Sequence, residues 1–159
     1  MRKGITMLKN FKRATEKDIL RLKDSYSDSF CIFDTGEKDS LLYIKELFVN
    51  GIVYHISVDD EVIGWLAYEV HRNVSVLKGI YVKSAYHGTK LSRDLLKFYF
   101  KKCGTEGVRY SLVNSSSESV WTIKFYKKYG YESFHGHDSD MIYHWTIKND
   151  KFSTLIKSF

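Results

Sequence analysis

The chain has 159 residues, of which 43% are hydrophobic, and a formal net charge of +6 at pH 7. This length and apolar content predict one domain with its own hydrophobic core, and nothing in the sequence argues for two. No apolar run approaches membrane-spanning length, and the stretch after the basic N-terminus is too short for the apolar core of a signal peptide. Cys31 and Cys103 are isolated and lack metal-ligand spacing, which favours reduced thiols and a cytoplasmic setting.

The first half of the chain predicts a strand, two helices and a hairpin. Thr15 with Asp18 three residues later is close to a capping box and marks the start of the first helix. Asp59-Asp60 lies between two apolar runs and predicts a hairpin turn. The predicted elements are a strand at 5–11, a helix after Thr15, a loop at 30–39, a helix from Asp39 or Ser40 to Asn50, and strands at 52–58 and 62–70.

The second half begins with a buried strand at 74–82, rich in β-branched residues, which Gly79 interrupts where a strand would bulge or splay. The elements predicted after it are a helix at 89–103, a strand at 109–113, a helix containing Tyr126, and strands at 131–134 and 141–147. A strand, helix and strand in succession predict parallel pairing through a right-handed crossover. His135 and His137 fall in the loop of the last hairpin and lack a third ligand, so no metal site is predicted.

The turn between the strand at 74–82 and the following helix is a candidate phosphate site. A strand, a short polar turn with glycine and a helix, in that order, leave the first N–H groups of the helix unpaired at the positive end of its dipole. His87, Lys90 and Arg93 surround this turn with cationic or potentially cationic side chains. We therefore expect this corner to bind phosphate.

Two segments of the chain resemble the signatures of the GNAT superfamily of acyl-CoA-dependent N-acyltransferases. The first, IYVKSAYHGTKLSRDLL at 80–96, is similar to a family motif in which a bulged strand is followed by Arg/Gln-x-x-Gly-x-Gly/Ala, whose amides bind the CoA pyrophosphate. Here His87 replaces Arg or Gln, Lys90 replaces the middle glycine, and Ser92 replaces Gly or Ala. The second, FYKKYGY at 125–131, resembles a family helix that ends in Tyr-x-x-x-Gly-Phe/Tyr.

The resemblance implies an α+β fold in three layers (α/β/α). Its central sheet would be mixed and mostly antiparallel, with about seven strands and a splayed central strand pair. One N-acetyltransferase domain would span residues 1–148, and the basic tail at 149–159 would dock as a short helix on the sheet or on a second subunit. A homodimer formed through the last strands or this tail is a hypothesis by analogy with the family.

The resemblance also implies transfer of an acetyl group from acetyl-CoA to a primary amine of a small molecule or a protein, in a ternary complex and without a metal. Tyr126 would protonate the leaving thiolate, and Glu69 is the predicted base, with His71 or water as alternatives. Main-chain groups at Ile80, Tyr81 and Val82 would contact the pantetheine arm and the carbonyl. The predicted CoA-binding residues are Ile80, Tyr81, Val82, His87, Gly88, Thr89, Lys90, Leu91, Ser92, Arg93 and Tyr126.

Two other functions stay open. A GNAT-like domain without catalysis, which binds CoA or a protein partner, is compatible with His87 and Lys90 in the altered motif. A nucleic-acid-binding domain would account for the net charge and for the 16% aromatic content. The basic residues are dispersed, however, and CoA is itself a polyanion, so the nucleic-acid hypothesis is disfavoured. No membrane partner is predicted.

Overall fold

The computed structural model describes residues 10–27, 29–31, 40–113, 124, 127–129, 131–138 and 141–148. Its strands are β1 (Lys12–Arg13), β2 (Ser29–Cys31), β3 (Ile52–Val58), β4 (Glu61–His71), β5 (Val74–Lys83), β6 (Tyr110–Val113), β7 (Glu132–Asp138) and β8 (Met141–Lys148). Its helices are η1 (Glu16–Asp18), α2 (Ile19–Ser27), α3 (Ser40–Asn50), η2 (Ser84–Tyr86) and α4 (Leu91–Thr105). No helix in the described part of the chain is long and apolar enough to cross a membrane.

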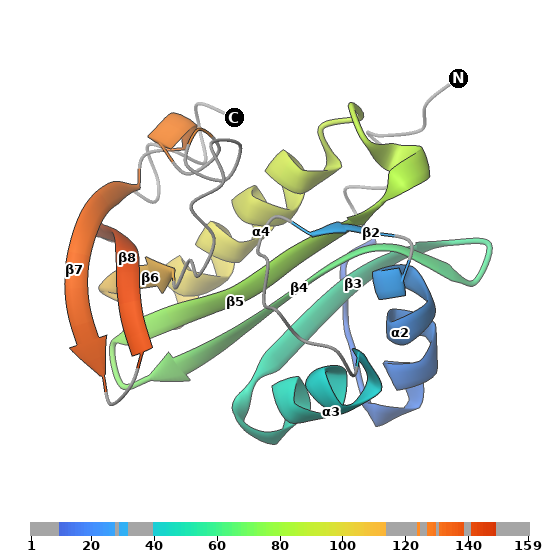
Figure 1. Cartoon of the computed structure of the whole chain (residues 1–159), viewed down its shortest axis with the longest axis horizontal. Coiled ribbons are helices and arrows are strands. Elements are labelled where there is room, and N and C mark those ends of the chain that lie inside the picture. Colours follow the sequence, from blue (N-terminus) through green and yellow to red (C-terminus); the bar gives the residue numbers. More distant parts are fainter. Residues whose placement is uncertain are drawn as a thin grey trace.

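The described strands form one sheet of eight in the order β1-β3-β4-β5-β6-β8-β7, with β2 paired to β5 off this path (Figure 1). Among these strands β5 and β6 form the parallel pair, and the other pairs are antiparallel. The predicted α+β class with a mixed, mostly antiparallel sheet is therefore confirmed. The sheet has one strand more than expected because β2 forms in a segment that has no strand pattern of its own.

The two faces of the sheet carry separate cores, because successive residues of a strand point to opposite sides. Leu66 and Tyr68 of β4 are fully buried with Leu95 of α4 on one face. Trp65, which alternates with them, is fully buried with Leu22 of α2 on the other face, where α3 also packs. The sheet is thus the middle of three layers, with α4 on one side and α2 and α3 on the other (Figure 1).

Strand β5 has an irregular centre, as the sequence predicts from Gly79. Ala67 of β4 lies opposite Gly79, whereas the next residue of β4 lies opposite Leu77, so Lys78 has no opposite residue in β4. This bulge coincides with the end of the pairing to β6, which accompanies β5 only from Val74 to Leu77. Among the described residues, β5 therefore has β6 as its partner on this edge before the bulge and β2 as its partner after it.

A buried chain of hydroxyl groups joins β5 to β6 where the two strands are paired. The Tyr99 hydroxyl of α4 donates to Ser75 Oγ at 2.7 Å and lies 2.7 Å from Ser111 Oγ, and these two serines are opposite each other in the sheet. Ser111 Oγ in turn lies 2.8 Å from the Tyr131 hydroxyl. Burial raises the pKa of Tyr99, so its hydroxyl keeps the proton that it donates. These hydroxyl groups therefore fix β5 against β6 where the two strands are paired.

Most predicted elements lie where the sequence places them. The helix that becomes α3 ends at Asn50, and β3 and β4 form the predicted hairpin with positive φ at Asp59 and Asp60. Two predictions are wrong, because the predicted loop at 30–39 begins with part of a strand, and residues 135–138 continue β7 instead of forming a loop. Most of the predicted strand at 5–11 and the tail at 149–159 lie outside the described residues.

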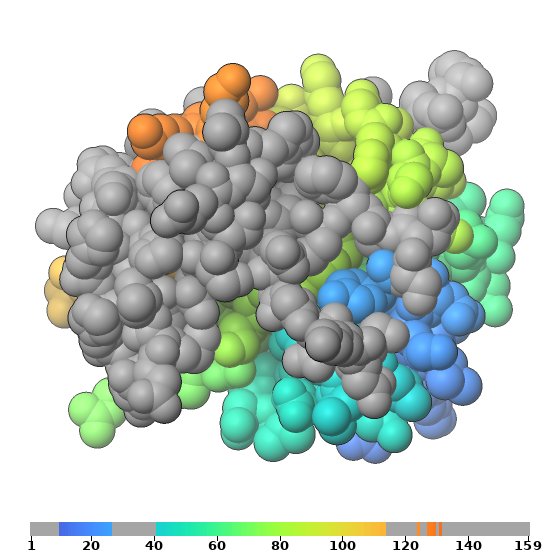
Figure 2. Space-filling view, in the orientation of Figure 1, coloured from blue at the N-terminus to red at the C-terminus, as the bar shows by residue number. Residues whose placement is uncertain are grey.

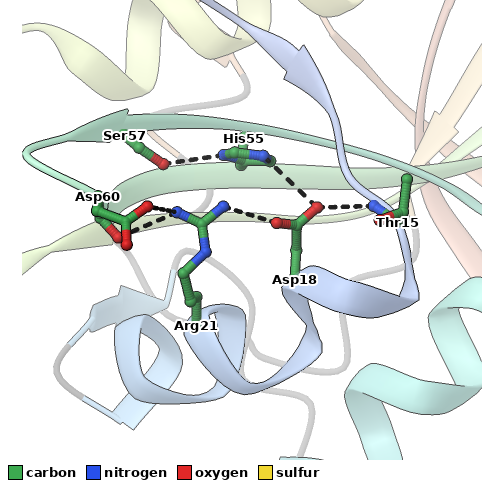
Figure 3. A network of polar contacts seen from close by, with 6 residues as sticks. All are labelled: Thr15, Asp18, Arg21, His55, Ser57 and Asp60. Carbon is green, nitrogen blue, oxygen red and sulfur yellow. Dashed lines mark hydrogen bonds and ion pairs between the residues drawn. The ribbon is translucent and has the colours of Figure 1, made fainter.

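A network of polar side chains joins the start of α2 to β3 and to the β3–β4 turn (Figure 3). Asp18 accepts a hydrogen bond from the Thr15 backbone N–H at 2.8 Å and one from Arg21 at 2.6 Å. Arg21 also bonds Asp60, while His55 Nδ1 lies 3.0 Å from Ser57 Oγ and its Nε2 lies 3.8 Å from Asp18. Burial alone would raise the pKa of Asp18, but Arg21, the Thr15 amide and His55 outweigh this effect and lower it.

We expect His55 to make the folded state less stable under mildly acidic conditions. Burial lowers the pKa of His55 below 6.5, and Arg21 and Lys12 add to this against the attraction of Asp18. The unfolded chain therefore binds a proton below pH 6.5 that the folded chain does not, and stability falls from there down to the folded-state pKa. Asp18 contributes only at lower pH, because its pKa lies below 3.8.

The measurement is chemical denaturation at pH 7.5 and at pH 5.5 of the wild type and of His55→Gln. The wild type should lose more free energy of unfolding between the two pH values than the variant does. Equal losses would show that His55 does not titrate differently in the folded and unfolded states.

Candidate functional site

The turn that follows β5 is held by its own backbone. The His87 N–H bonds the Ser84 carbonyl at 3.2 Å, and Thr89 donates to the Tyr86 carbonyl through both its N–H, at 3.3 Å, and its hydroxyl, at 2.5 Å. Gly88 has a φ of +79°, a conformation that residues with a side chain rarely adopt. The polar turn predicted between the strand and the helix is therefore compact and depends on glycine at position 88.

Lys90 also has a left-handed backbone, with φ of 68° and ψ of 11°, immediately before α4. This conformation explains why the family motif has glycine at this position and why a lysine here carries a backbone strain of about 1 kcal/mol. The first intrahelical bond runs from the Asp94 N–H to the Lys90 carbonyl at 3.0 Å. The N–H groups of residues 91–93 therefore have no acceptor within the helix, as the phosphate hypothesis requires.

His87 closes the turn against the end of β5. Its Nε2 lies 3.3 Å from the Val82 carbonyl, and since a carbonyl only accepts, the hydrogen bond requires the tautomer with the proton on Nε2. The residue that replaces the family's Arg or Gln thus has a contact that ties the loop to the strand.

A basic hollow of about 410 Å³ lies at the start of α4. It is lined by Gly88, Lys90, Ser92, Arg93, Lys124, Lys128 and Tyr129. Every charged residue among the described lining residues is cationic. On the surface, the orange atoms of the segment around 124–129 lie beside the yellow-green start of α4 (Figure 2). The structure therefore brings the two motif segments to one site, where four cations and the first N–H groups of the helix, which have no acceptor within it, favour a polyanion.

Arg93 is held at the edge of this hollow. Its Nη2 lies 3.3 Å from a carboxylate oxygen of Asp94, and its Nε is buried without a hydrogen-bond partner among the described residues. Burial raises the pKa of Asp94, an effect that the Arg93 charge opposes. Arg93 thus keeps donor capacity beyond its contact with Asp94.

The three predicted residues of β5 have buried side chains, so only their backbone groups are available to a ligand. Ile80 and Val82 are buried in the core under α4, and Tyr81 is buried in the core under α2 and α3. Leu91 is likewise buried in the α4 core, so only its N–H group can contribute. On the edge of β5 away from β4, residues Tyr81 to Lys83 pair with β2.

The structure describes one of the two predicted catalytic residues, Glu69, but not the other, Tyr126. Tyr126 lies outside the described residues, although Lys124 and Lys128 on either side of it line the hollow. Glu69 is hydrogen-bonded to His71 Nε2 at 2.8 Å and ion-paired with Lys78 at 3.5 Å, and it lies opposite Val76, toward the end of β5 away from the turn. Six residues of strand, about 20 Å, separate this point from Val82. The catalytic roles of both residues stay predictions.

Sequence reasoning missed the lining residues Lys124, Lys128 and Tyr129. Lys124 and Lys128 are four positions apart, which places both on one face of a helix, and this spacing was the available signal. Among the described residues, no group of three or more His, Cys, Asp and Glu side chains is placed to hold a metal ion.

Comparisons with known proteins agree with the fold and with the family motifs. Solved structures similar to this chain include a GNAT-family protein from Desulfovibrio desulfuricans, with a TM-score of 0.71 and 17% identity over 87% of this chain and 98% of that one. The PaiA N-acetyltransferase of Thermoplasma acidophilum, in complex with coenzyme A, has a TM-score of 0.68 and 17% identity over 87% and 98%. An aminoglycoside 6'-N-acetyltransferase complexed with coenzyme A has a TM-score of 0.68 and 13% identity over 87% and 96%.

No curated protein gives a significant match to the sequence. The model of the acetyltransferase (GNAT) domain matches residues 49–133, which is more than half of the chain and includes α4 and the turn that precedes it. The chain therefore belongs to the GNAT acetyltransferase family.

Proposed function

We propose that this protein transfers an acetyl group from acetyl-CoA to a primary amine of a small molecule or a protein. The observation that carries the proposal is the basic hollow lined by Lys90, Arg93, Lys124 and Lys128 at the start of α4, whose first N–H groups have no acceptor within the helix. The coenzyme A in the Thermoplasma and aminoglycoside enzymes of the same fold supports CoA as the polyanion. A cytoplasmic location is part of the proposal.

The reaction is a direct attack in a ternary complex. The neutral amine nitrogen forms a bond to the thioester carbon while the carbon–sulfur bond breaks and the CoA thiolate leaves. Main-chain N–H groups near Ile80 to Val82 would polarise the carbonyl, on the edge of β5 that described residues of β6 accompany only as far as Leu77. Tyr126 would donate a proton to the thiolate.

Glu69 or water would take the proton of the amine. Glu69 is ion-paired with Lys78 and hydrogen-bonded to His71, so acting as base would require it to leave these contacts. Removal of the amine proton by water is the alternative that leaves them in place. The variant Glu69→Gln distinguishes the two mechanisms. If Glu69 is the base, the variant should lower kcat and leave the KM for acetyl-CoA unchanged, whereas proton removal by water should leave both unchanged.

Binding of acetyl-CoA is tested with the strained lysine of the hollow. Lys90→Gly should raise the free energy of unfolding by about 1 kcal/mol, because glycine adopts the left-handed backbone without strain. The same change should weaken acetyl-CoA binding about fivefold, because it removes one cation beside the phosphates. Calorimetric titration and denaturation measure the two effects.

Arg72→Gly is the matched control. Arg72 also has a positive φ, 59°, and it lies in the turn between β4 and β5 at the opposite end of β5. This variant loses the same charge and the same type of strain, so its stability should rise while its affinity for acetyl-CoA stays that of the wild type. Equal affinities for all three proteins would place the phosphates elsewhere.

A domain without catalysis is the second candidate, since Lys90 alters the motif. Acetyl-CoA binding with no transfer to any amine in a panel of polyamines, aminoglycosides, amino acids and peptides would favour it. Transfer that disappears in Tyr126→Phe while binding persists would favour the enzyme.

A further inference from the structure

Strand β2 lies on the edge of β5 that faces away from β4. A strand has two edges, and β4 pairs with one of them from Val74 to Val82. On the other edge β6 pairs with Val74 to Leu77, and β2 pairs with Tyr81 to Lys83. Figure 1 shows β6 and β2 at opposite ends of β5. Only Lys78, Gly79 and Ile80 lie between the two partners.

This edge is the one that the proposed function assigns to the acyl donor. The pantetheine arm of CoA contains two amide groups. These can form hydrogen bonds with the backbone at an open strand edge, as an added strand does. Phe30 lies opposite Val82 and Cys31 opposite Tyr81 in the antiparallel pair. The backbone groups of β5 cannot pair with β2 and with a pantetheine arm at the same time.

We propose that β2 is a displaceable strand that closes the donor site, so that acyl-CoA binds only when β2 separates from β5. The inference rests on the proposed function, because it requires acyl-CoA to be the ligand. Among the described residues, β2 pairs with β5 through Ser29–Cys31, a pairing at the short end of the usual range of strand lengths that a ligand could replace. The apparent affinity for acyl-CoA then depends on the fraction of molecules in which β2 has separated.

The rest of the site keeps its structure when β2 leaves. The Tyr81 ring stacks on Trp65 at 4.1 Å and meets the edge of Tyr26 at 5.2 Å, and its hydroxyl lies 2.5 Å from that of Tyr43. These contacts come from β4, α2 and α3. β5 is also paired with β4 at Tyr81 and Val82, two of the three residues that β2 covers. Displacement of β2 therefore opens the edge without unfolding the strand behind it.

A disulfide between β2 and β5 tests the proposal. Ser29 lies opposite Lys83, and Cα atoms of opposite residues in an antiparallel pair are about 4.5–5.5 Å apart, which suits a disulfide. The test protein is Ser29→Cys/Lys83→Cys in a Cys31→Ser parent, which removes the neighbouring thiol. Calorimetric titration with acetyl-CoA is performed on its oxidised form and on the same sample after reduction with dithiothreitol.

The oxidised form should bind acetyl-CoA at least tenfold more weakly than the reduced form, and the reduced form should bind like the parent. The control is Val58→Cys/Glu61→Cys in the same parent, a disulfide across the β3–β4 hairpin where these residues are opposite. Both double variants remove the ion pair between Lys83 and Glu61, so they share that change. Oxidation of the control should leave binding unchanged.

Three results would contradict the proposal in different ways. Equal binding by the oxidised and reduced forms would overturn the displacement of β2 and leave the proposed function intact. A count of free thiols showing no disulfide after oxidation would contradict the pairing of Ser29 with Lys83. Absence of acetyl-CoA binding by the parent itself would overturn the proposed function, and the role of β2 would fall with it.

Discussion

Gly88→Glu is expected to weaken acetyl-CoA binding at least thirtyfold, about 2 kcal/mol. Gly88 lines the basic hollow, and a Cβ at this position would meet no atom within 4 Å, so the new side chain has room at the site. A carboxylate there would repel the pyrophosphate with an energy of this order even at an effective dielectric constant of about 20. The dissociation constant from calorimetric titration is the measurement.

Gly107→Glu is the control for this variant. Gly107 follows the other end of α4 and has a similar positive φ of 72°, and a Cβ added there would likewise meet no atom within 4 Å. The two variants share the charge and the backbone strain, so each should lose about 1 kcal/mol of stability. Only Gly88→Glu should lose acetyl-CoA binding. A comparable loss in Gly107→Glu would mean that the effect comes from net charge or from strain, and not from contact with the ligand.

Gly79→Ala is expected to lower the free energy of unfolding by about 2 kcal/mol, the usual cost of overpacking a filled core. A Cβ at Gly79 would overlap the far end of the Tyr81 ring. That ring is fully buried between Trp65 and Tyr26, and its hydroxyl contacts Tyr43, so it has no free space to move into. Denaturation with urea measures the change.

Tyr81→Leu provides the double-mutant test of this explanation. In the Tyr81→Leu background the ring is absent, and Gly79→Ala should then cost less than about 0.5 kcal/mol. Gly104→Ala, in the last turn of α4 where a Cβ meets no atom within 4 Å, should be neutral or stabilising by up to about 1 kcal/mol. An unchanged cost of Gly79→Ala in the Tyr81→Leu background would show that the bulge backbone, and not the ring, requires glycine.

The fold and the phosphate corner could be predicted because their signals are local. α3 ends before Gly51, and the β3–β4 turn uses two aspartates with positive φ. Short sequence patterns predict both the helix end and the turn. Gly79 marks the bulge, and Gly88 marks the turn before α4. These features are decided by a few neighbouring residues, so one sequence was enough to place them.

Other parts of the site depend on contacts between segments far apart in the chain. Lys124 and Lys128 line the same hollow as Lys90 because the sheet brings the two motif segments together, and their spacing alone gives only the face of a helix. The distance of Glu69 from the turn likewise follows from its register opposite Val76. The sequence order alone does not show how far a candidate base lies from the turn, since this distance depends on the register of the paired strands.

By itself, the sequence determined the order of the elements, the bulge, the glycine turn and the family. Each of these features depends on residues that are close together in the chain. Only the tertiary structure decided that Ser29–Cys31 is a strand. Three residues after a helix carry no periodicity, and they are extended because the edge of β5 beyond β6 offers unpaired backbone groups there. The proposed acyl donor requires the same edge, so β2 and the donor would compete for the same backbone groups of β5.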